Sequence, residues 1–502
     1  MIDVMTTDLD GRVRALNDRP VELGGAKYVL CWVQQTLRSH DNPLIDAAVV
    51  LGNQLELPVL VYHGLRQDYP HASDRLHAFI LGASRDLQAG CRARGLRAVT
   101  YVERMGFEQK GLLYRLASDA AAVITDDQPV FVARWQANAF AQKWQRQVLA
   151  VDTARLVPTH VLPTGLKTTP AFRAASTPLR ATYEAHACDF ASTQPPYDGP
   201  LCFDDHDIAA MSDAQLAAIV TVCDIDHTVP AQEAFEPSAA AASAALARFV
   251  TDNLARYAYR RNNPADETGV SRLSPYLHFG LLGPRSIVRA VRASGAPRST
   301  QWKFLDELLT WREWFHYLAA HSPHPEIFDS LPAAAQKTLL AHADDERPVI
   351  YPLCALLHGE TDDETWNAAQ RQWLVDGYMH NNLRMYWGKR LIEWTADPQS
   401  AWITACYIND RLSLDGRDPA TYGNMQWCFG RARPGYSERP VYGWVSPKKD
   451  TALRKRPNAE AWLTAKATMM TPRIQVPAQA FLATGFSDRL LAAPTDQLSG
   501  GS

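Results

Sequence analysis

Residues 27–62 read KYVLCWVQQTLRSHDNPLIDAAVVLGNQLELPVLVY. Two short runs in this stretch, 27–33 and 58–62, are apolar at almost every position, which is typical of strands buried on both faces of a parallel sheet. The residues between them have helical spacing over 43–55. Because parallel strands need a long crossover, usually a helix, the stretch predicts a strand–helix–strand unit of an α/β fold.

The same alternation continues to about residue 155. We expect further strands at 98–102, 121–125 and, more weakly, 148–151, with helices at 72–94, 107–118 and 130–145. This order predicts a doubly wound, Rossmann-like parallel sheet, a fold that often binds nucleotide-like ligands at the carboxyl ends of its strands. The chain has no G-x-G-x-x-G after the first strand and no G-x-x-x-x-G-K-[ST], so this half alone identifies no ligand.

Composition divides the rest of the chain. Residues 156–240 are rich in Pro, Thr, Ala and Asp, which predicts a long interdomain linker with some helical turns. Almost every later segment has helical period, which predicts an all-α domain over 241–480, followed by a tail at 481–502. The clearest helical segments lie near 241–256, 284–294, 301–320, 366–395 and 398–407. The fold class is therefore an α/β domain over 1–155 joined by a linker to an all-helical domain.

Charge and cysteine patterns exclude several classes of protein. The 502 residues include 51 Lys and Arg against 54 Asp and Glu, so a nucleic-acid surface must be a local patch. The chain has no apolar run of membrane-spanning length and no apolar core of a secretion signal near its start. The eight cysteines form no C-x-x-C and the 15 histidines no H-E-x-x-H. We expect reduced thiols, no metal site and a cytoplasmic location.

A candidate anion site lies at 257–280, YAYRRNNPADETGVSRLSPYLHFG. Ser271 and Ser274 flank Arg272 just before a helix that begins with Pro275. Hydroxyls, free N–H groups at a helix start and a nearby cation suit a diphosphate. An ordinary capped helix start is the alternative.

Tryptophan is concentrated in the helical half, where 11 of the 14 lie after residue 300. In WNAAQRQWLVDGYMHNNLRMYWGKRLIEW (366–394), Trp387 and Trp394 share a helix face, and Arg384 lies on a neighbouring edge. An arginine on an aromatic face is costly unless it meets an anion or a carboxylate. The acidic turn that contains Asp415 offers such a carboxylate. A large helical core with a solvated helix face is the alternative.

A carboxylate and an indole lie together in FLDELLTWREWFHYL (304–318). Glu307 and Trp311 are four residues apart and therefore share one helix face. In an enzyme that handles bases, such a pair could bond a pyrimidine edge and stack on its ring. An ordinary amphipathic helix, with Arg312 and Glu313 exposed, is the alternative.

The order of these motifs resembles the photolyase/cryptochrome flavoproteins, and most closely the class II cyclobutane pyrimidine dimer photolyases. The resemblance covers nearly the whole chain. It is carried by the opening stretch and by LSPYLHFG, WNAAQ, MH-x-x-LRMYWGKRLIEW, NDRLSLDGRDP and ERPVYG. It implies a deoxyribodipyrimidine photo-lyase with an α/β antenna domain and a helical FAD domain. Such an enzyme flips a pyrimidine dimer out of UV-damaged DNA and splits it by electron transfer from excited, reduced FAD.

The resemblance also assigns roles to residues of this chain. Arg384 and Asp415 match an ion pair beside the flavin ring, Asn409 matches an amide facing flavin N5, and with Glu307 these form the catalytic set. Trp387 and Trp366 match an electron relay that Trp394 extends or branches. The implied FAD contacts are Tyr257, Val270, Ser271, Arg272, Leu273, Ser274, Asn381, Arg384, Asn409, Asp415 and Gly416. The implied DNA or lesion contacts are Arg261, Asn262, Glu307, Trp311, Met385, Trp427, Arg439, Lys448, Lys449 and Arg454, of which the last four belong to a local basic run.

Some expectations stay open at this stage. TWREW and the Asn381–Asn382 pair depart from the class II pattern beside the implied lesion pocket, so substrate preference is open. No motif selects the antenna chromophore, so an 8-hydroxy-5-deazaflavin, a folate and an empty pocket all stay open. A cryptochrome-like photoreceptor without repair activity is the rival interpretation, and a helical nucleic-acid-binding protein without flavin is a third. The resemblance further implies a monomer, associated with the nucleoid in a bacterium.

Overall fold

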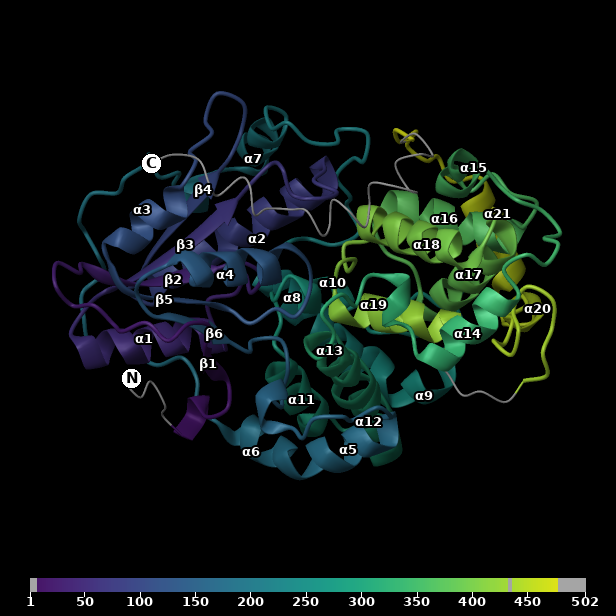
Figure 1. The fold of residues 1–502 in the computed structure, drawn as a ribbon, viewed down its shortest axis with the longest axis horizontal. Helices are drawn as coiled ribbons and strands as arrows, with labels where there is room; N and C mark the ends of the chain where they lie inside the picture. The colour runs from purple at the N-terminus through teal and green to yellow at the C-terminus, as the bar shows by residue number, and fades with distance from the viewer. Residues whose placement is uncertain (1–6, 432–435, 477–502) are drawn as a thin grey trace.

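The computed structural model describes residues 7–431 and 436–476 and has a sheet-containing half and a helical half, at the left and right of Figure 1. Within these residues the sheet has six strands in the order β1-β6-β5-β2-β3-β4. β1 pairs antiparallel with β6, and the other neighbours pair parallel. The strands are β1 (Val13–Ala15), β2 (Tyr28–Val33), β3 (Val59–Leu65), β4 (Arg97–Val102), β5 (Ala120–Asp126) and β6 (Val148–Val151).

Helices cover both faces of the sheet, as the doubly wound prediction requires. Alternate residues of β2 point to opposite faces, so that Val29 and Cys31 join one core and Leu30 and Trp32 join the other. Helices α1 (Pro43–Leu55) and α2 (Asp74–Ala93) cover the first face, and α3 (Leu112–Ser118) and α4 (Phe131–Lys143) cover the second. The five predicted strands are confirmed. Strand β1 was not predicted, because three residues are too few for a detectable alternation.

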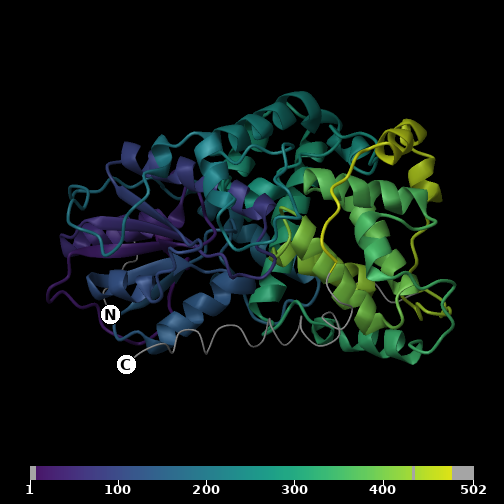
Figure 2. The same cartoon turned by 90° about the horizontal axis from the view of Figure 1, so that it is seen from above.

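Residues 156–240 connect the halves along the surface and include short helices. Helix α7 packs on α2 of the sheet-containing half, whereas α5 and α6 pack against helical segments that follow residue 284. In Figure 1, α5 and α6 lie at the bottom of the view and α7 lies at the top, and Figure 2 shows the same two halves from above. The short helices are α5 (Thr169–Ser176), α6 (Arg180–Ala185) and α7 (Asp213–Val220).

The helical half consists of packed helices around a second apolar core. That core contains five tryptophans that are almost fully buried. The helices are α8 (Ala239–Arg248), α9 (Tyr257–Arg260), α10 (Ser274–His278), α11 (Pro284–Ala293), α12 (Arg298–Asp306), α13 (Glu313–Ala320), α14 (Ala333–Ala341), α15 (Leu353–His358), α16 (Glu364–Asp376), α17 (Asn381–Trp394), α18 (Pro398–Leu412), α19 (Pro419–Gln426), α20 (Thr451–Arg454) and α21 (Ala459–Ala467).

Three of the predicted helical segments are interrupted. In 241–256, α8 is followed by a π-helical turn (Phe249–Asn253) and a 3-10 turn (Leu254–Arg256). The segment 366–395 divides into α16 and α17 because Gly377 adopts a left-handed conformation, with φ 63°. A Cβ atom at Gly377 would lie 3.2 Å from both Arg75 Cδ and Leu414 Cγ, so the break is also a point of close approach. The segment 301–320 contains a π-helical turn, Glu307–Arg312, between α12 and α13. Single π turns inside helices are frequently found at functional sites.

Arg75 joins the two halves. This residue of α2 is 1% exposed, and its guanidinium donates to the carbonyls of Leu374 (2.5 Å), Leu412 (2.8 Å) and Trp373 (3.2 Å) at the ends of α16 and α18. Its Nε also donates to the carbonyl of Pro230. A cation at the C-termini of two helices compensates their dipoles, so this contact fixes the helical half against the sheet.

No helix within the described residues combines the length and the apolarity needed to cross a bilayer. All eight cysteines are free thiols in the structure. Five of them are buried, whereas Cys202 and Cys354 are exposed.

Candidate functional site

A polar cavity of about 140 Å³ lies inside the helical half. Segments that are far apart in the sequence form it: the start of α10, the π turn, the loop before α17, the loop after α18, and α19. Its lining residues are Ser274, Arg312, Tyr378, Met379, Asn381, Arg384, Asp415, Asp418, Ala420, Thr421 and Asn424. Four of the implied FAD contacts, Ser274, Asn381, Arg384 and Asp415, therefore line one cavity.

Arg384 and Asp415 form an ion pair in the wall of this cavity. Arg384 Nη2 donates to Asp415 Oδ1 over 2.9 Å, and both side chains are almost fully buried. Burial alone would raise the pKa of Asp415, but the charge of Arg384 and hydrogen bonds from Ser274 and Ser413 outweigh it, so the pKa is lowered. The pair therefore stays ionised, with its charges matched inside the protein.

Asn409 is linked to this pair through Ser413 and has an unused acceptor. Its backbone carbonyl accepts from the Ser413 N–H over 2.9 Å, and the Ser413 hydroxyl donates to Asp415 Oδ1 over 2.5 Å. The Asn409 side chain is fully buried, and Nδ2 donates to Asp410 Oδ1 over 3.1 Å. Within the described residues, neither Asn409 Oδ1 nor Arg384 Nε has a hydrogen-bond partner. Buried polar atoms without partners are rare and indicate a ligand or water. Gly416 packs so closely that a Cβ there would lie 2.8 Å from the carbonyl oxygen of Asn409.

The other implied FAD contacts lie around the cavity rather than in its lining. Tyr257 is buried and packs edge-on against Phe249 and Phe304. Arg272 has a positive φ of 53°, and its guanidinium lies 5.2 Å from the ring centre of Tyr378, which does line the cavity. Val270 and Ser271 are half-buried, whereas Leu273 belongs to the apolar core.

Several lining residues were not identified from the sequence. Arg312 belongs to the cavity wall and donates to the carbonyl of Ala154 over 2.7 Å. Glu313, which an ordinary amphipathic helix would leave exposed together with Arg312, is 1% exposed. Asp418 accepts from His278 (3.1 Å), with His316 at 3.3 Å. Burial alone would raise the pKa of Asp418, but the two histidines and Arg312 hold it well below its usual range. The D-G-R-D-P turn was the available signal, although nothing in it showed which carboxylate faces the cavity.

Trp366 contacts both of the other predicted relay indoles. The rings of Trp366 and Trp387 stack with their centres 5.8 Å apart, and those of Trp366 and Trp394 meet edge-on at 5.4 Å. Trp387 Nε1 donates to Gln370 Oε1 over 2.9 Å. Trp394 in turn contacts the half-buried ring of Tyr351 at 5.2 Å, so the indoles run outward through the helical core.

The π turn contains Glu307 and Trp311, and Trp427 packs against the second of them. The rings of Trp311 and Trp427 meet edge-on at 5.1 Å. Glu307 Oε1 lies 2.7 Å from Arg261 Nη2 and 2.6 Å from Lys303 Nζ, so two cations hold the carboxylate. Met385 lies near Trp427, since its Sδ is 3.7 Å from Cys428 Sγ.

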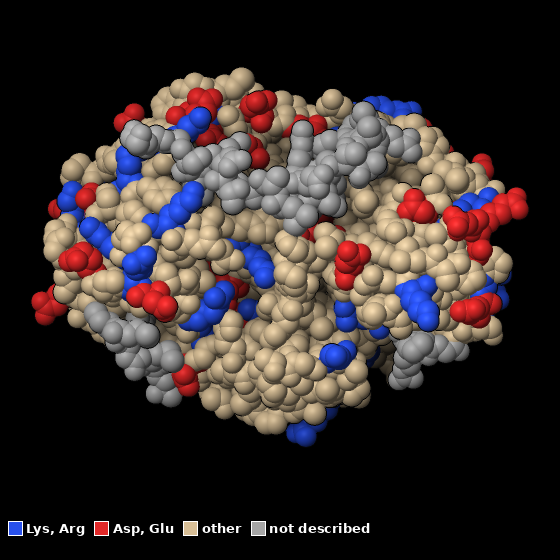
Figure 3. All heavy atoms as spheres, viewed as in Figure 1, with Lys and Arg blue, Asp and Glu red and all other residues tan. Residues whose placement is uncertain are grey.

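The predicted basic run is only partly available to a ligand. Arg454 pairs with Asp450 (2.7 Å) and Glu364 (2.9 Å). Lys448 contacts the side chain of Asn382, which in turn donates to the carbonyl of Asn262. Arg439 and Lys449 are exposed. On the face drawn in Figure 3, acidic and basic groups of the described residues are interspersed.

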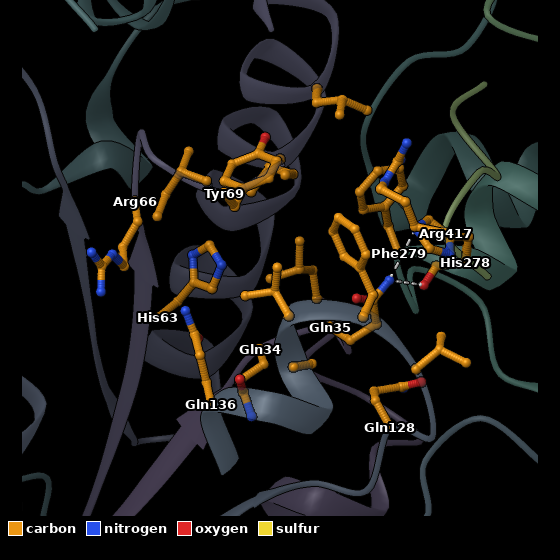
Figure 4. Close-up of a pocket in the computed structure, with 18 of the residues that line it drawn as sticks. Gln34, Gln35, His63, Arg66, Tyr69, Gln128, Gln136, His278, Phe279 and Arg417 are labelled. Atoms are coloured by element: carbon orange, nitrogen blue, oxygen red, sulfur yellow. Dashed lines mark hydrogen bonds between the residues drawn. The ribbon is translucent and has the colours of Figure 1, made fainter. Parts of the chain in front are cut away.

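A second cavity, of about 120 Å³, lies between the two halves at the carboxyl ends of β2 and β3 (Figure 4). Gln34, His63 and Gln136 line it from the sheet side, and Phe279 and Arg417 line it from the helical side. A larger hollow of about 470 Å³ adjoins it and shares several lining residues. From β2 the chain continues to β3 and β4 on one side of the sheet, and it then crosses to β5 on the other side of β2. Such a switch point is where α/β sheets bind ligands.

Comparison with known proteins identifies the family. Residues 29–189 match the DNA photolyase family model. Over nearly its whole length the chain is similar to the deoxyribodipyrimidine photo-lyase of Methanothermobacter thermautotrophicus, with 31% identity over 450 residues that cover 89% of this chain and 95% of that protein. The chain belongs to the DNA photolyase family. The deoxyribodipyrimidine photo-lyase of Arabidopsis thaliana is also similar to this photolyase-family chain, with 27% identity over 447 residues, 87% of this chain and 88% of that one.

Solved photolyase structures share the fold of this family member. A class III photolyase from Agrobacterium tumefaciens matches with a TM-score of 0.64 and 19% identity, covering 91% of each chain. A photolyase from Sulfolobus tokodaii matches with a TM-score of 0.60 and 16% identity, covering 86% of this chain and 88% of that one. These likenesses confirm the predicted fold class, an α/β domain followed by a helical one.

Proposed function

We propose that this protein is a deoxyribodipyrimidine photo-lyase, which repairs pyrimidine dimers in UV-damaged DNA with light and FAD. The observation that carries the proposal is the buried Arg384–Asp415 pair in the wall of a polar cavity, with Asn409 linked to the pair through Ser413. The similar proteins from Methanothermobacter and Arabidopsis carry the name of this enzyme, which favours repair over a photoreceptor role. Membership of class II rests on the sequence motifs alone.

The cavity residues fit FAD. Arg384 and Asp415 present matched charges to a flavin ring, and the unused Oδ1 of Asn409 accepts from a ring N–H. Ser274, Arg312 and Asn424 offer a hydroxyl, a cation and an amide to a phosphate-containing ligand. When bound, FAD supplies the light-absorbing electron donor, whereas the protein supplies binding, orientation and a fixed electrostatic environment.

The surface beside the π turn suits a flipped dimer. Trp311 and Trp427 form an aromatic corner for a base, and Glu307 presents a carboxylate to a pyrimidine edge. Because Arg261 and Lys303 both pair with Oε1 of Glu307, the carboxylate is held in place to accept base N–H groups. We assign the DNA backbone to the exposed Arg439 and Lys449, together with Lys448 and Arg454 of the basic run.

The remaining assignments follow the same pattern. Trp387, Trp366 and Trp394 form the path for electrons from the surface, since their rings are in contact. The interdomain cavity holds an aromatic antenna chromophore, because it lies at the switch point of the sheet between Phe279 and His63. We also propose the domain division expected from the sequence, whose tail at 481–502 lies outside the described residues, and a cytoplasmic monomer.

An absorption spectrum followed by a repair assay tests this function. The purified protein should show a flavin spectrum, and under blue light the reduced protein should convert dimer-containing oligonucleotides to intact thymines while a dark control stays unchanged. A colourless protein that takes up no added FAD would contradict the flavin assignment. A flavin-containing protein that leaves dimers intact under light would instead support the photoreceptor.

A further inference from the structure

Trp373 connects the indoles to the ion pair of the cavity. It lies on α16 and is fully buried. Its ring meets that of Trp387 edge-on, with the ring centres 5.1 Å apart. On its face lies the guanidinium of Arg384, 5.3 Å from the ring centre. No residue role assigned above depends on Trp373, although it touches both the relay and the Arg384–Asp415 pair.

We propose that Trp373 is a positioning residue that holds the Arg384 guanidinium against Asp415 through a cation–π contact, and thereby sets the affinity of the cavity for FAD. The proposal rests on the proposed function, because it concerns the same cavity. Trp373 acts only through Arg384, since the cavity lining does not include it.

The hydrogen bonds of Arg384 leave its orientation incompletely fixed. Those made to the described residues all start from Nη2, which reaches Asp415 over 2.9 Å and, more weakly, Ser413 and the carbonyl of Met379 over 3.4 Å. Nε has no partner among the described residues. A guanidinium held through one nitrogen can turn about that contact. A rigid aromatic face beneath the guanidinium therefore restricts its plane.

An aromatic ring at this position stabilises the buried charge of Arg384. Arg384 is 6% exposed, so it lacks the water that would stabilise its charge. In a desolvated site the quadrupole of an indole stabilises a cation more than at a surface. An aliphatic side chain of similar volume fills the space but offers no negative face, so the guanidinium would lose part of its hold beside Asp415.

Comparison of W373F with W373L separates this role from simple packing. Both substitutions remove the indole, but only phenylalanine keeps an aromatic face. Leucine also leaves the larger cavity, so the effect of cavity size has to be measured separately. We expect W373L to weaken FAD binding about tenfold, measured as Kd by titration of the FAD-free protein, and W373F to restore Kd to within about threefold of the original value. W402F and W402L are the matched controls, because Trp402 is also buried and contacts Phe429 rather than a cation.

A double-mutant cycle in the FAD-free protein provides a second readout. W373L should lower the unfolding midpoint more than W373F does. In an R384M/D415N background, where the cation and its partner are both absent, this difference should shrink to the one that cavity size causes between W402L and W402F. A difference that stays as large in that background, or equal FAD Kd values for W373F and W373L, would overturn the proposal. A protein that binds no FAD at any concentration would refute the proposed function instead, and the FAD-free cycle would still decide whether Trp373 holds Arg384.

Discussion

Glu307 is the charged residue that we propose to bind the pyrimidine edge of the substrate. Arg261 and Lys303 both bind it, so its substitution removes one acceptor and leaves two cations without their partner. We expect E307Q to lower the yield of light-driven dimer repair about tenfold with an unchanged FAD content, because a charge-assisted hydrogen bond to the base edge becomes a neutral one.

The matched control is D213N, which neutralises a carboxylate that pairs with Arg85 at the distant surface of α7. Repair yield and FAD content, measured together, decide the assignment. An E307Q protein that repairs as well as the D213N control would remove Glu307 from the lesion site.

Trp387 contacts two other indoles. Its ring stacks on Trp366 of the relay and meets Trp373 edge-on. Phenylalanine fills most of the space but is far harder to oxidise than an indole. We therefore expect W387F to slow light-driven reduction of bound FAD at least tenfold, followed by absorbance with an added thiol as the electron source. Chemically reduced W387F should still repair dimers. Photoreduction at the original rate would mean that electrons take another path.

At the scale of elements, α13 places a carboxyl group in the junction between the halves. Glu313 accepts from the backbone N–H of Leu156 over 2.6 Å, and burial raises its pKa to about 7. The folded protein therefore binds a proton that the unfolded chain releases above its ordinary pKa of 4.5. It follows that the free energy of unfolding falls as the pH rises from about 4.5 to 7 and loses this dependence above that range.

E313Q keeps the acceptor for Leu156 and removes the titration. We expect the variant to be more stable than the original protein by about 1–3 kcal/mol at pH 8 and nearly equal to it at pH 4.5. Urea unfolding of both proteins at the two pH values measures this difference in unfolding free energy. The contributions of the other titrating groups are the same in both proteins and cancel. A pH-independent difference would show that Glu313 does not titrate with folding.

The break between α16 and α17 depends on Gly377. We expect G377A to cost about 1–2 kcal/mol of unfolding free energy, because alanine is strained at positive φ and its Cβ would approach Arg75 and Leu414. Gly95 is the control: it also has a positive φ, but nothing lies within 4 Å of the position of its Cβ. G95A should therefore report the backbone strain alone, and equal costs for the two variants would exclude crowding at Gly377.

The elements of this fold were predictable where the signal is local. The strands from β2 to β6 and helices such as α1 follow from apolar runs and spacing within a dozen residues. That Arg384 needs an anion or a carboxylate was predictable from its apolar helix face, whereas the choice of Asp415 as its partner came from the family resemblance. In contrast, the π turn and the places of Arg312 and Tyr378 in the cavity depend on contacts between distant segments, which no local pattern records. Trp373 was one indole among many until Arg384 was seen on its face.

At the scale of the whole molecule, Arg75 determines whether the two halves unfold together. Alanine at this position would leave the carbonyls at the ends of α16 and α18 without their donor. We expect R75A to lose about 3 kcal/mol or more of stability and to split thermal unfolding, measured by calorimetry, into two transitions. R92A is the control, because Arg92 lies on the same helix but pairs with Asp207 at the surface. A single cooperative transition for R75A would show that other contacts couple the halves.

The anchoring of Arg75 has a consequence for light harvesting. Its guanidinium clamps the ends of the helices that carry Trp373 and Asn409, while its own helix packs on the sheet whose strand ends line the interdomain cavity. A pigment in that cavity and a flavin beside Asn409 would thus keep a constant separation and mutual orientation. Resonance energy transfer between two dyes falls steeply with distance and depends on the angle between their transition dipoles. In this way the buried Arg75 would keep the efficiency of energy transfer from the pigment to the flavin constant.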